Sequence, residues 1–65
     1  MRPWLRVGDL LINPDHVVEV AFDQEERSAG PRCTVILLST GARLSFVEGS
    51  REAIAVRKFF DEDPG

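Results

Sequence analysis

The chain has 65 residues, of which 43% are hydrophobic, 8% aromatic and 29% charged, and its formal net charge is −3 at pH 7. A chain of this length forms one small domain that buries only about 60% of its unfolded surface. A single cysteine excludes an intrachain disulfide, and no apolar run approaches the roughly 18 residues of a membrane span.

The N-terminus lacks the apolar core of a signal peptide, so we expect a cytoplasmic, bacterial-type protein with no membrane association. We also expect one domain over residues 1–65, with frayed ends at residues 1–3 and 61–65.

Glycine and proline divide the first half of the chain into short β-strands. Residues 4–7 and 10–12 flank Gly8-Asp9, a pair that suits a tight II′ hairpin because glycine accepts a positive φ. Asn13-Pro14-Asp15 predicts a turn, since proline presets φ and the Asn and Asp side chains bond nearby backbone groups. Residues 17–23 then alternate as a strand.

The middle of the chain predicts a long hairpin followed by a tight one. Gln24 to Arg32 is polar and ends in Gly30-Pro31, which indicates an exposed loop. Residues 33–39 form the most apolar strand, and Thr40-Gly41 turns the chain into the alternating strand at residues 42–47.

The C-terminal third predicts one amphipathic helix. Ser50 suits the N-cap, because its hydroxyl can accept a hydrogen bond from a free N–H group of the first turn. Ala53, Val56, Phe59 and Phe60 form an apolar stripe with Ile54 at its margin, and we expect the helix to end near Phe60.

Side-chain alternation decides which strand faces meet the helix. With Thr40-Gly41 as a two-residue turn, Leu37 opposes Leu44, and one face collects most of the aliphatic side chains. That predicted helix-covered face consists of Val18, Val20, Phe22, Val35, Leu37, Leu44 and Phe46.

The opposite face should still carry apolar residues, although one helix cannot cover both sides of a sheet. We interpret them as an interface with a second copy or a protein partner. The alternatives are that Trp4 and Leu11 fold over them, or that they are scattered surface aliphatics. Trp4 itself suits either a recognition anchor or a cover for the open edge of the core. The predicted interface residues are Trp4, Val17, Ala21, Ile36, Leu38 and Val47.

Several short motifs resemble one known family. They are Leu11-Ile12-Asn13-Pro14, Val17-Val18-Glu19-Val20, Thr34-Val35-Ile36-Leu37, Thr40-Gly41 and the segment Val47 to Ile54. Over Leu10 to Phe60 they are similar to FlbD-type small flagellar proteins. The resemblance implies a cytoplasmic, non-enzymatic accessory of flagellar motility. The chain departs from that pattern in its longer Gln24–Arg32 loop, in the inserted Gly49 and in Thr40, where the family has Asn.

Candidate chemical groups are better explained as structural. His16 is the only histidine and follows a turn, whereas zinc sites need three or four ligands. Cys33 and His16 should lie roughly 20 Å apart, at opposite ends of paired strands. The carboxylates at Glu25-Glu26 and in residues 61–63 form solvated runs, and the arginines are dispersed rather than gathered in a basic stripe.

The sequence therefore predicts an α+β fold, an antiparallel meander of four or five strands with one C-terminal helix on one face. The predicted function is non-catalytic protein–protein interaction or self-assembly, with no cofactor, metal ion or small-molecule substrate. A flagellar-motility accessory is the alternative, and a nucleic-acid-binding module is the second alternative.

Overall fold

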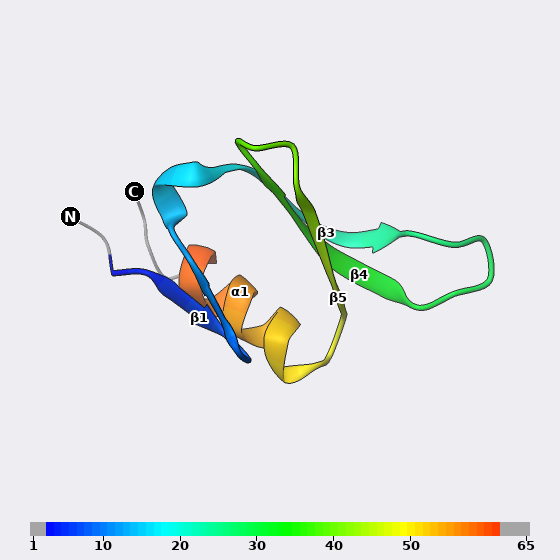
Figure 1. The fold of residues 1–65 in the computed structure, drawn as a ribbon. Coiled ribbons are helices and arrows are strands. Elements are labelled where there is room, and N and C mark those ends of the chain that lie inside the picture. The colour runs from blue at the N-terminus through cyan, green and yellow to red at the C-terminus, as the bar shows by residue number, and fades with distance from the viewer. Residues whose placement is uncertain (1–2, 62–65) are drawn as a thin grey trace.

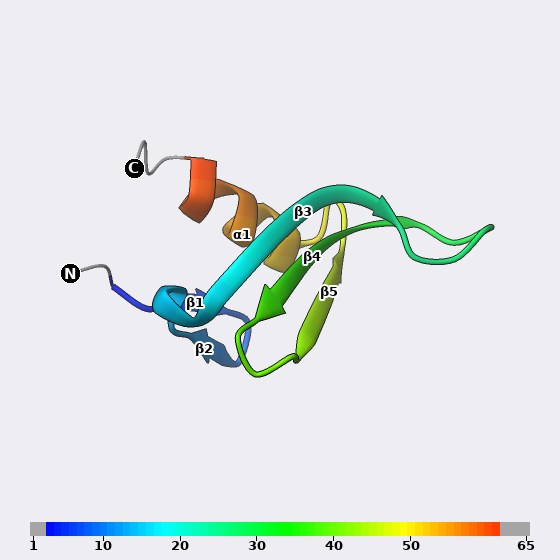
Figure 2. The ribbon, with the colours of Figure 1, turned by 90° about the horizontal axis from the view of Figure 1, so that it is seen from above.

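The computed structural model describes residues 3–61; of the ends predicted to fray, residues 1–2 and 62–65 lie outside the described residues. Five strands form two antiparallel sheets, β1-β2 and β3-β4-β5, and helix α1 packs against both, on β1 and on β4 and β5 (Figures 1 and 2). The elements are β1 (Leu5–Val7), β2 (Leu10–Ile12), the short 3-10 helix η1 (Pro14–His16), β3 (Val17–Glu25), β4 (Arg32–Leu38), β5 (Arg43–Val47) and α1 (Arg51–Asp61). The α+β prediction is confirmed, but the strands form two sheets rather than one meander.

The first sheet is the expected tight hairpin. Val7 pairs with Leu10 across Gly8-Asp9, and Gly8 has a φ of 59°, in the left-handed region that the turn requires. The predicted turn after β2 is also present. Asn13 caps η1, and its side-chain oxygen accepts a 3.0 Å hydrogen bond from the Asp15 N–H.

The pairing of β4 with β5 differs by one residue from the predicted register. The Leu38 N–H donates to the Ala42 carbonyl and the Gly41 N–H to the Leu38 carbonyl, both at 2.9 Å. Residues 39–41 are thus a three-residue loop, with Gly41 at a φ of 91°, a common alternative to the two-residue turn. As a result, Ile36 lies opposite Leu44.

A one-residue shift moves every side chain of a strand to the other face. Ile36 is 0% exposed and belongs to the core, so its prediction as part of a bare apolar face was wrong. Val17 and Leu38 are half-buried and pack against the same core. Val35 and Leu37, predicted beneath the helix, lie on the outer face instead.

Strand β3 contains two irregularities that the alternation did not predict. One lies between Val17 and Glu19, and Val18, predicted to face the helix, is 64% exposed there. The other lies between Ala21 and Gln24, where Asp23 has a φ of 56°. Such bulges insert unpaired residues and bend the strand.

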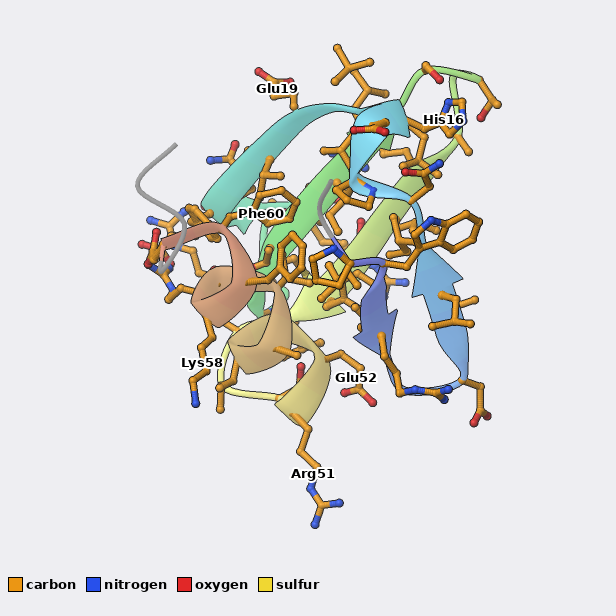
Figure 3. The ribbon with its side chains drawn as sticks, turned by 90° about the vertical axis from the view of Figure 1, so that its left-hand side faces the viewer. His16, Glu19, Arg51, Glu52, Lys58 and Phe60 are labelled. Carbon is orange, nitrogen blue, oxygen red and sulfur yellow. The ribbon has the colours of Figure 1, made fainter. Side chains whose placement is uncertain are left out.

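Helix α1 closes the core as predicted. The Ser50 hydroxyl accepts a 3.2 Å hydrogen bond from the Ala53 N–H, which confirms the N-cap. Phe60 points toward the sheets, whereas Arg51 and Lys58 point away from them (Figure 3). The central cluster consists of Leu5, Val7, Ile12, Ile36 and Val56, with Phe59 and Phe60 packed against it.

Candidate functional site: an apolar groove between the sheets

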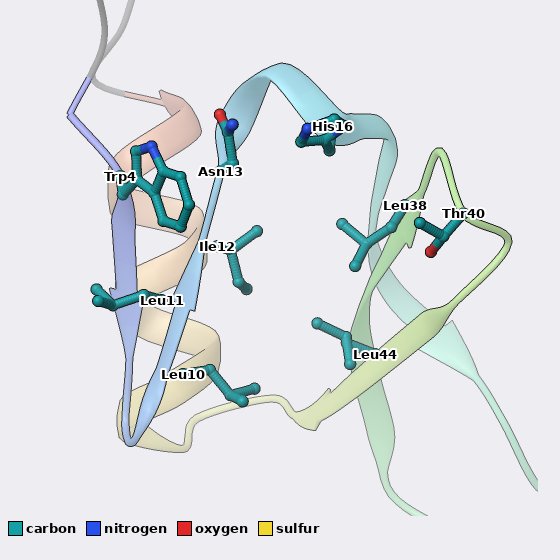
Figure 4. A pocket seen from close by; sticks show the side chains of 9 residues that line it. All are labelled: Trp4, Leu10, Leu11, Ile12, Asn13, His16, Leu38, Thr40 and Leu44. Carbon is teal, nitrogen blue, oxygen red and sulfur yellow. The ribbon is translucent and has the colours of Figure 1, made fainter.

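An apolar groove of about 370 Å³ lies between the two sheets (Figure 4). The side chains of Leu10, Ile12, Leu38 and Leu44 converge on it from opposite sides (Figure 4). The groove is lined by Trp4, Leu10, Leu11, Ile12, Asn13, His16, Leu38, Thr40 and Leu44. Six of these nine residues are apolar, so the groove suits hydrocarbon side chains.

Two strand edges border the groove. Strand β2 has only β1 as a neighbour in its sheet, and β5 has only β4, within residues 3–61. Edge strands present backbone N–H and C=O groups to a further strand. Leu10 to Ile12 of β2 and Leu44 of β5 line the groove, so two edge strands contribute to its apolar lining.

The groove retains large exposed apolar side chains. Trp4 is 55% exposed, Leu10 45% and Leu11 54%. Exposed aromatic and aliphatic groups around a concave surface are typical of binding sites.

The polar residues lie at one end of the groove and have intramolecular partners. The side-chain oxygen of Asn13, Oδ1, caps η1 by accepting a hydrogen bond from the Asp15 N–H. His16 Nδ1 lies 3.1 Å from the Ser39 hydroxyl, and the Ser39 N–H donates to the His16 carbonyl at 2.7 Å. These contacts fasten η1 to the β4–β5 loop and so shape this end of the groove.

The six predicted interface residues are dispersed by the observed register. Trp4 and Leu38 both line the groove. Val17 and Ile36 contribute to the core, whereas Ala21 and Val47 lie on the outer side of the three-stranded sheet. The structure thus brings together two of the six.

Sequence reasoning missed most of the groove, above all Leu10, Ile12 and Leu44. The signal was present in the run Leu10-Leu11-Ile12. Alternation places Leu10 and Ile12 on one face of β2, where Ile12 reaches the core and Leu10 stays 45% exposed, and it places Leu11 on the other face, 54% exposed. The second strand of the hairpin therefore already indicated an unpartnered apolar surface.

The outer face of the three-stranded sheet carries a charged clamp. The Glu26 carboxylate accepts two 2.6 Å hydrogen bonds from the Arg43 guanidinium and one of 2.9 Å from the Ser45 hydroxyl. These bonds lower the pKa of Glu26 from its ordinary value of 4.5 to about 2, with Arg43 the largest cause. Because Glu26 follows β3 and its partners belong to β5, the clamp crosses β4 and ties the long loop to the sheet.

Glu48 joins three elements near the start of α1. Its carboxylate accepts hydrogen bonds from the Thr34 hydroxyl at 2.8 Å and from the Asp23 N–H at 2.6 Å, and it lies 3.8 Å from Arg57. These bonds, led by that from Thr34, hold the pKa of Glu48 below its ordinary value. Arg57 also stacks 4.3 Å above the ring of Phe22, so this network fixes α1 against β3 and β4.

Within residues 3–61, no group of three or more His, Cys, Asp or Glu side chains is arranged to hold a metal ion. No helix in that part of the chain has the length and apolar character needed to cross a membrane. Cys33 is buried on the outer face, with its thiol 3.7 Å from the Pro31 carbonyl.

Comparisons with known protein families, with curated proteins and with solved structures found no match. The resemblance to FlbD-type proteins stays a prediction.

Proposed function

We propose that this chain is a non-catalytic protein-interaction module, and that the groove and its free strand edges receive a β-strand of another protein molecule. The observation that carries the proposal is the combination of exposed Trp4 and Leu10 in one apolar groove with an edge strand, β5, whose outer side pairs with no strand of residues 3–61.

Strand addition is a recurring mode of peptide recognition. Main-chain hydrogen bonds to a sheet edge supply affinity, and pockets for alternate side chains supply specificity. Here β5 offers the edge, and the groove beside Leu44 offers an apolar pocket. An incoming strand with alternating apolar side chains matches both features.

The basic residues support this function over nucleic-acid binding. Arg32, Arg43 and Arg57 each lie within 4 Å of a carboxylate oxygen, at 3.6, 2.6 and 3.8 Å. Phosphate recognition instead requires basic side chains gathered on one face.

Site-specific photo-crosslinking tests the proposal. A photoreactive phenylalanine analogue replaces Leu10 in the groove, or Ile54 on the solvent side of α1 as the matched control, since both side chains are about half-exposed. The proposal predicts a discrete cross-linked polypeptide from position 10 and none from position 54. The captured chain is then identified, purified and titrated against the Leu10→Glu and Ile54→Glu variants. Equal cross-linking at both positions, or equal binding by both variants, would overturn the proposal.

A further inference from the structure

The free edge of β5 can be assigned residue by residue. The Leu38 N–H donates to the Ala42 carbonyl, and the Glu48 N–H donates to the Arg32 carbonyl. Along an antiparallel strand, alternate residues direct their backbone groups to the same neighbour. The even-numbered residues from 42 to 48 therefore face β4, and Arg43, Ser45 and Val47 direct theirs outward. Figure 2 shows β5 at the rim of the three-stranded sheet, on the side of β4 away from β3.

The two edges of the three-stranded sheet are not equivalent. Strand β3 has two bulges, and it exposes Glu19, Asp23 and Glu25. Bulges and edge charges are the usual means by which proteins prevent strand addition. Strand β5 pairs with β4 in an unbroken register and contains no proline. The chain thus protects one edge and leaves the other open.

Charge distinguishes the same two edges. The only charged residue within β5 is Arg43, and Glu26 neutralises it through two 2.6 Å hydrogen bonds. Two β5 edges can therefore approach without opposed like charges. Strand β3 carries Glu19, Asp23 and Glu25, of which Asp23 lies 3.6 Å from Arg32, and two β3 edges would bring these carboxylates together, which is unfavourable. Hence charge does not oppose the approach of a second copy to β5.

We propose that two copies of this chain pair antiparallel through β5, about a two-fold axis at Ser45. This inference rests on the proposed function and names a second copy as the bound molecule. Ser45 then pairs with Ser45 of the other copy, and Arg43 with Val47, both as hydrogen-bonded pairs because all three direct their backbone groups outward. The two three-stranded sheets become one continuous sheet of six strands.

This register also extends the apolar surface at the groove. Leu44 lines the groove, and Phe46 of the second copy lies beside it on the same face of the joined sheet. The two Arg43 side chains stay roughly 14 Å apart, since four residues at about 3.4 Å each separate them along the strand direction.

Disulfide trapping tests the pairing. The Ser45→Cys and Val47→Cys variants are each made with Cys33→Ala, which removes the one native thiol. Residue 45 opposes itself at a Cα separation of about 5.5 Å, within the range that a disulfide bridges. Residue 47 lies roughly 14 Å from its own copy, which is too far. We expect mild oxidation to give at least about tenfold more covalent dimer from position 45 than from position 47.

Sedimentation equilibrium of the unsubstituted chain is a second test of the pairing, and it does not depend on the folding of any variant. We expect a reversible dimer at about 100 µM. A strict monomer, or equal cross-linking at positions 45 and 47, would overturn the pairing. The proposed function would survive either result if photo-crosslinking at Leu10 captures a different polypeptide. The proposed function itself would be overturned if photo-crosslinking at position 10 captures no polypeptide.

Discussion

The Thr34 hydroxyl, 0% exposed, donates a 2.8 Å hydrogen bond to the Glu48 carboxylate, and this contact allows a polar residue to occupy the buried face of β4. Burying a hydroxyl that has no hydrogen-bond partner costs free energy. In the absence of Glu48, the register that places Thr34 on the outer face would therefore be favoured. The pair therefore supports the observed register, in which Thr34 and Ile36 face inward together.

Replacing Thr34 by valine preserves shape and removes the hydrogen bond. We expect Thr34→Val to lower the free energy of unfolding by about 1–3 kcal/mol, because Glu48 loses a partner for its charge. Urea unfolding followed by circular dichroism measures the change. The exposed Thr40→Val variant is the control, with an expected change within about 0.5 kcal/mol. Equal effects of the two substitutions would mean that the Thr34–Glu48 bond contributes nothing.

The Glu26 clamp makes stability depend on pH. Because the folded state holds the pKa of Glu26 at about 2, below its ordinary 4.5, the clamp stabilises the fold above about pH 4.5. That contribution is lost as the pH falls from 4.5 toward 2. In the unsubstituted chain, the urea midpoint should fall as the pH drops over this interval. We expect this fall to be smaller in Glu26→Gln and unchanged in Glu25→Gln. The same slope in Glu26→Gln and in the unsubstituted chain would argue against the clamp.

The register of β4 predicts which of two neighbouring aliphatic residues the fold depends on. Ile36 is 0% exposed in the core, and Leu37 is half-buried on the outer face. Ile36→Ala should cost about 2–5 kcal/mol, enough to unfold most molecules of so small a domain. Leu37→Ala should cost less than about 2 kcal/mol. Thermal unfolding measures the loss of stability in both variants. A greater loss of stability in Leu37→Ala than in Ile36→Ala would favour the register predicted from the sequence, in which Leu37 opposes Leu44.

Local signals predicted the elements well. Gly8-Asp9, Asn13-Pro14 and the Ser50 cap act through a few neighbouring residues, and all three are observed in their predicted roles. The register could not be predicted in this way, because Ser39-Thr40-Gly41 is compatible with either a two- or a three-residue loop. That single ambiguity reversed both faces of β4.

The groove was only partly accessible to sequence reasoning for a related reason. It lies between two sheets, and the prediction of a single meander has no such interface. Trp4 and Leu38 were identified as surface candidates, but their meeting with Leu10 and Leu44 depends on how the hairpin sits against the larger sheet.

Trp4 gives an optical test of groove occupancy. It is the only tryptophan in the chain, it lines the groove and it is 55% exposed. If a second copy covers the groove, Trp4 emission should shift to shorter wavelength as the protein concentration rises. Leu10→Glu should weaken the shift, since it places a charge against the apolar surface, and Ile54→Glu should preserve it. An emission maximum independent of concentration would show that association leaves Trp4 uncovered.

The salt dependence of dimerisation distinguishes strand pairing from an association driven by opposite charges. Each copy carries a formal charge of −3, so added salt screens the repulsion between copies. Dimerisation measured by sedimentation should therefore be unchanged or stronger when the ionic strength rises. A marked weakening would indicate that ion pairs, rather than strand pairing and apolar contact, hold the copies together.

The most direct test of β5 pairing is an isotope-filtered nuclear Overhauser experiment on a mixture of labelled and unlabelled chains. In the proposed dimer, Leu44 and Phe46 of the other copy form a pair without mutual hydrogen bonds, at a Cα separation of about 4.5 Å. Within one chain these residues are roughly 7 Å apart along the strand. Pairing through β5 predicts an intermolecular cross-peak between their α-protons. A spectrum of associated chains that lacks this cross-peak, with contacts elsewhere on the surface, would contradict it.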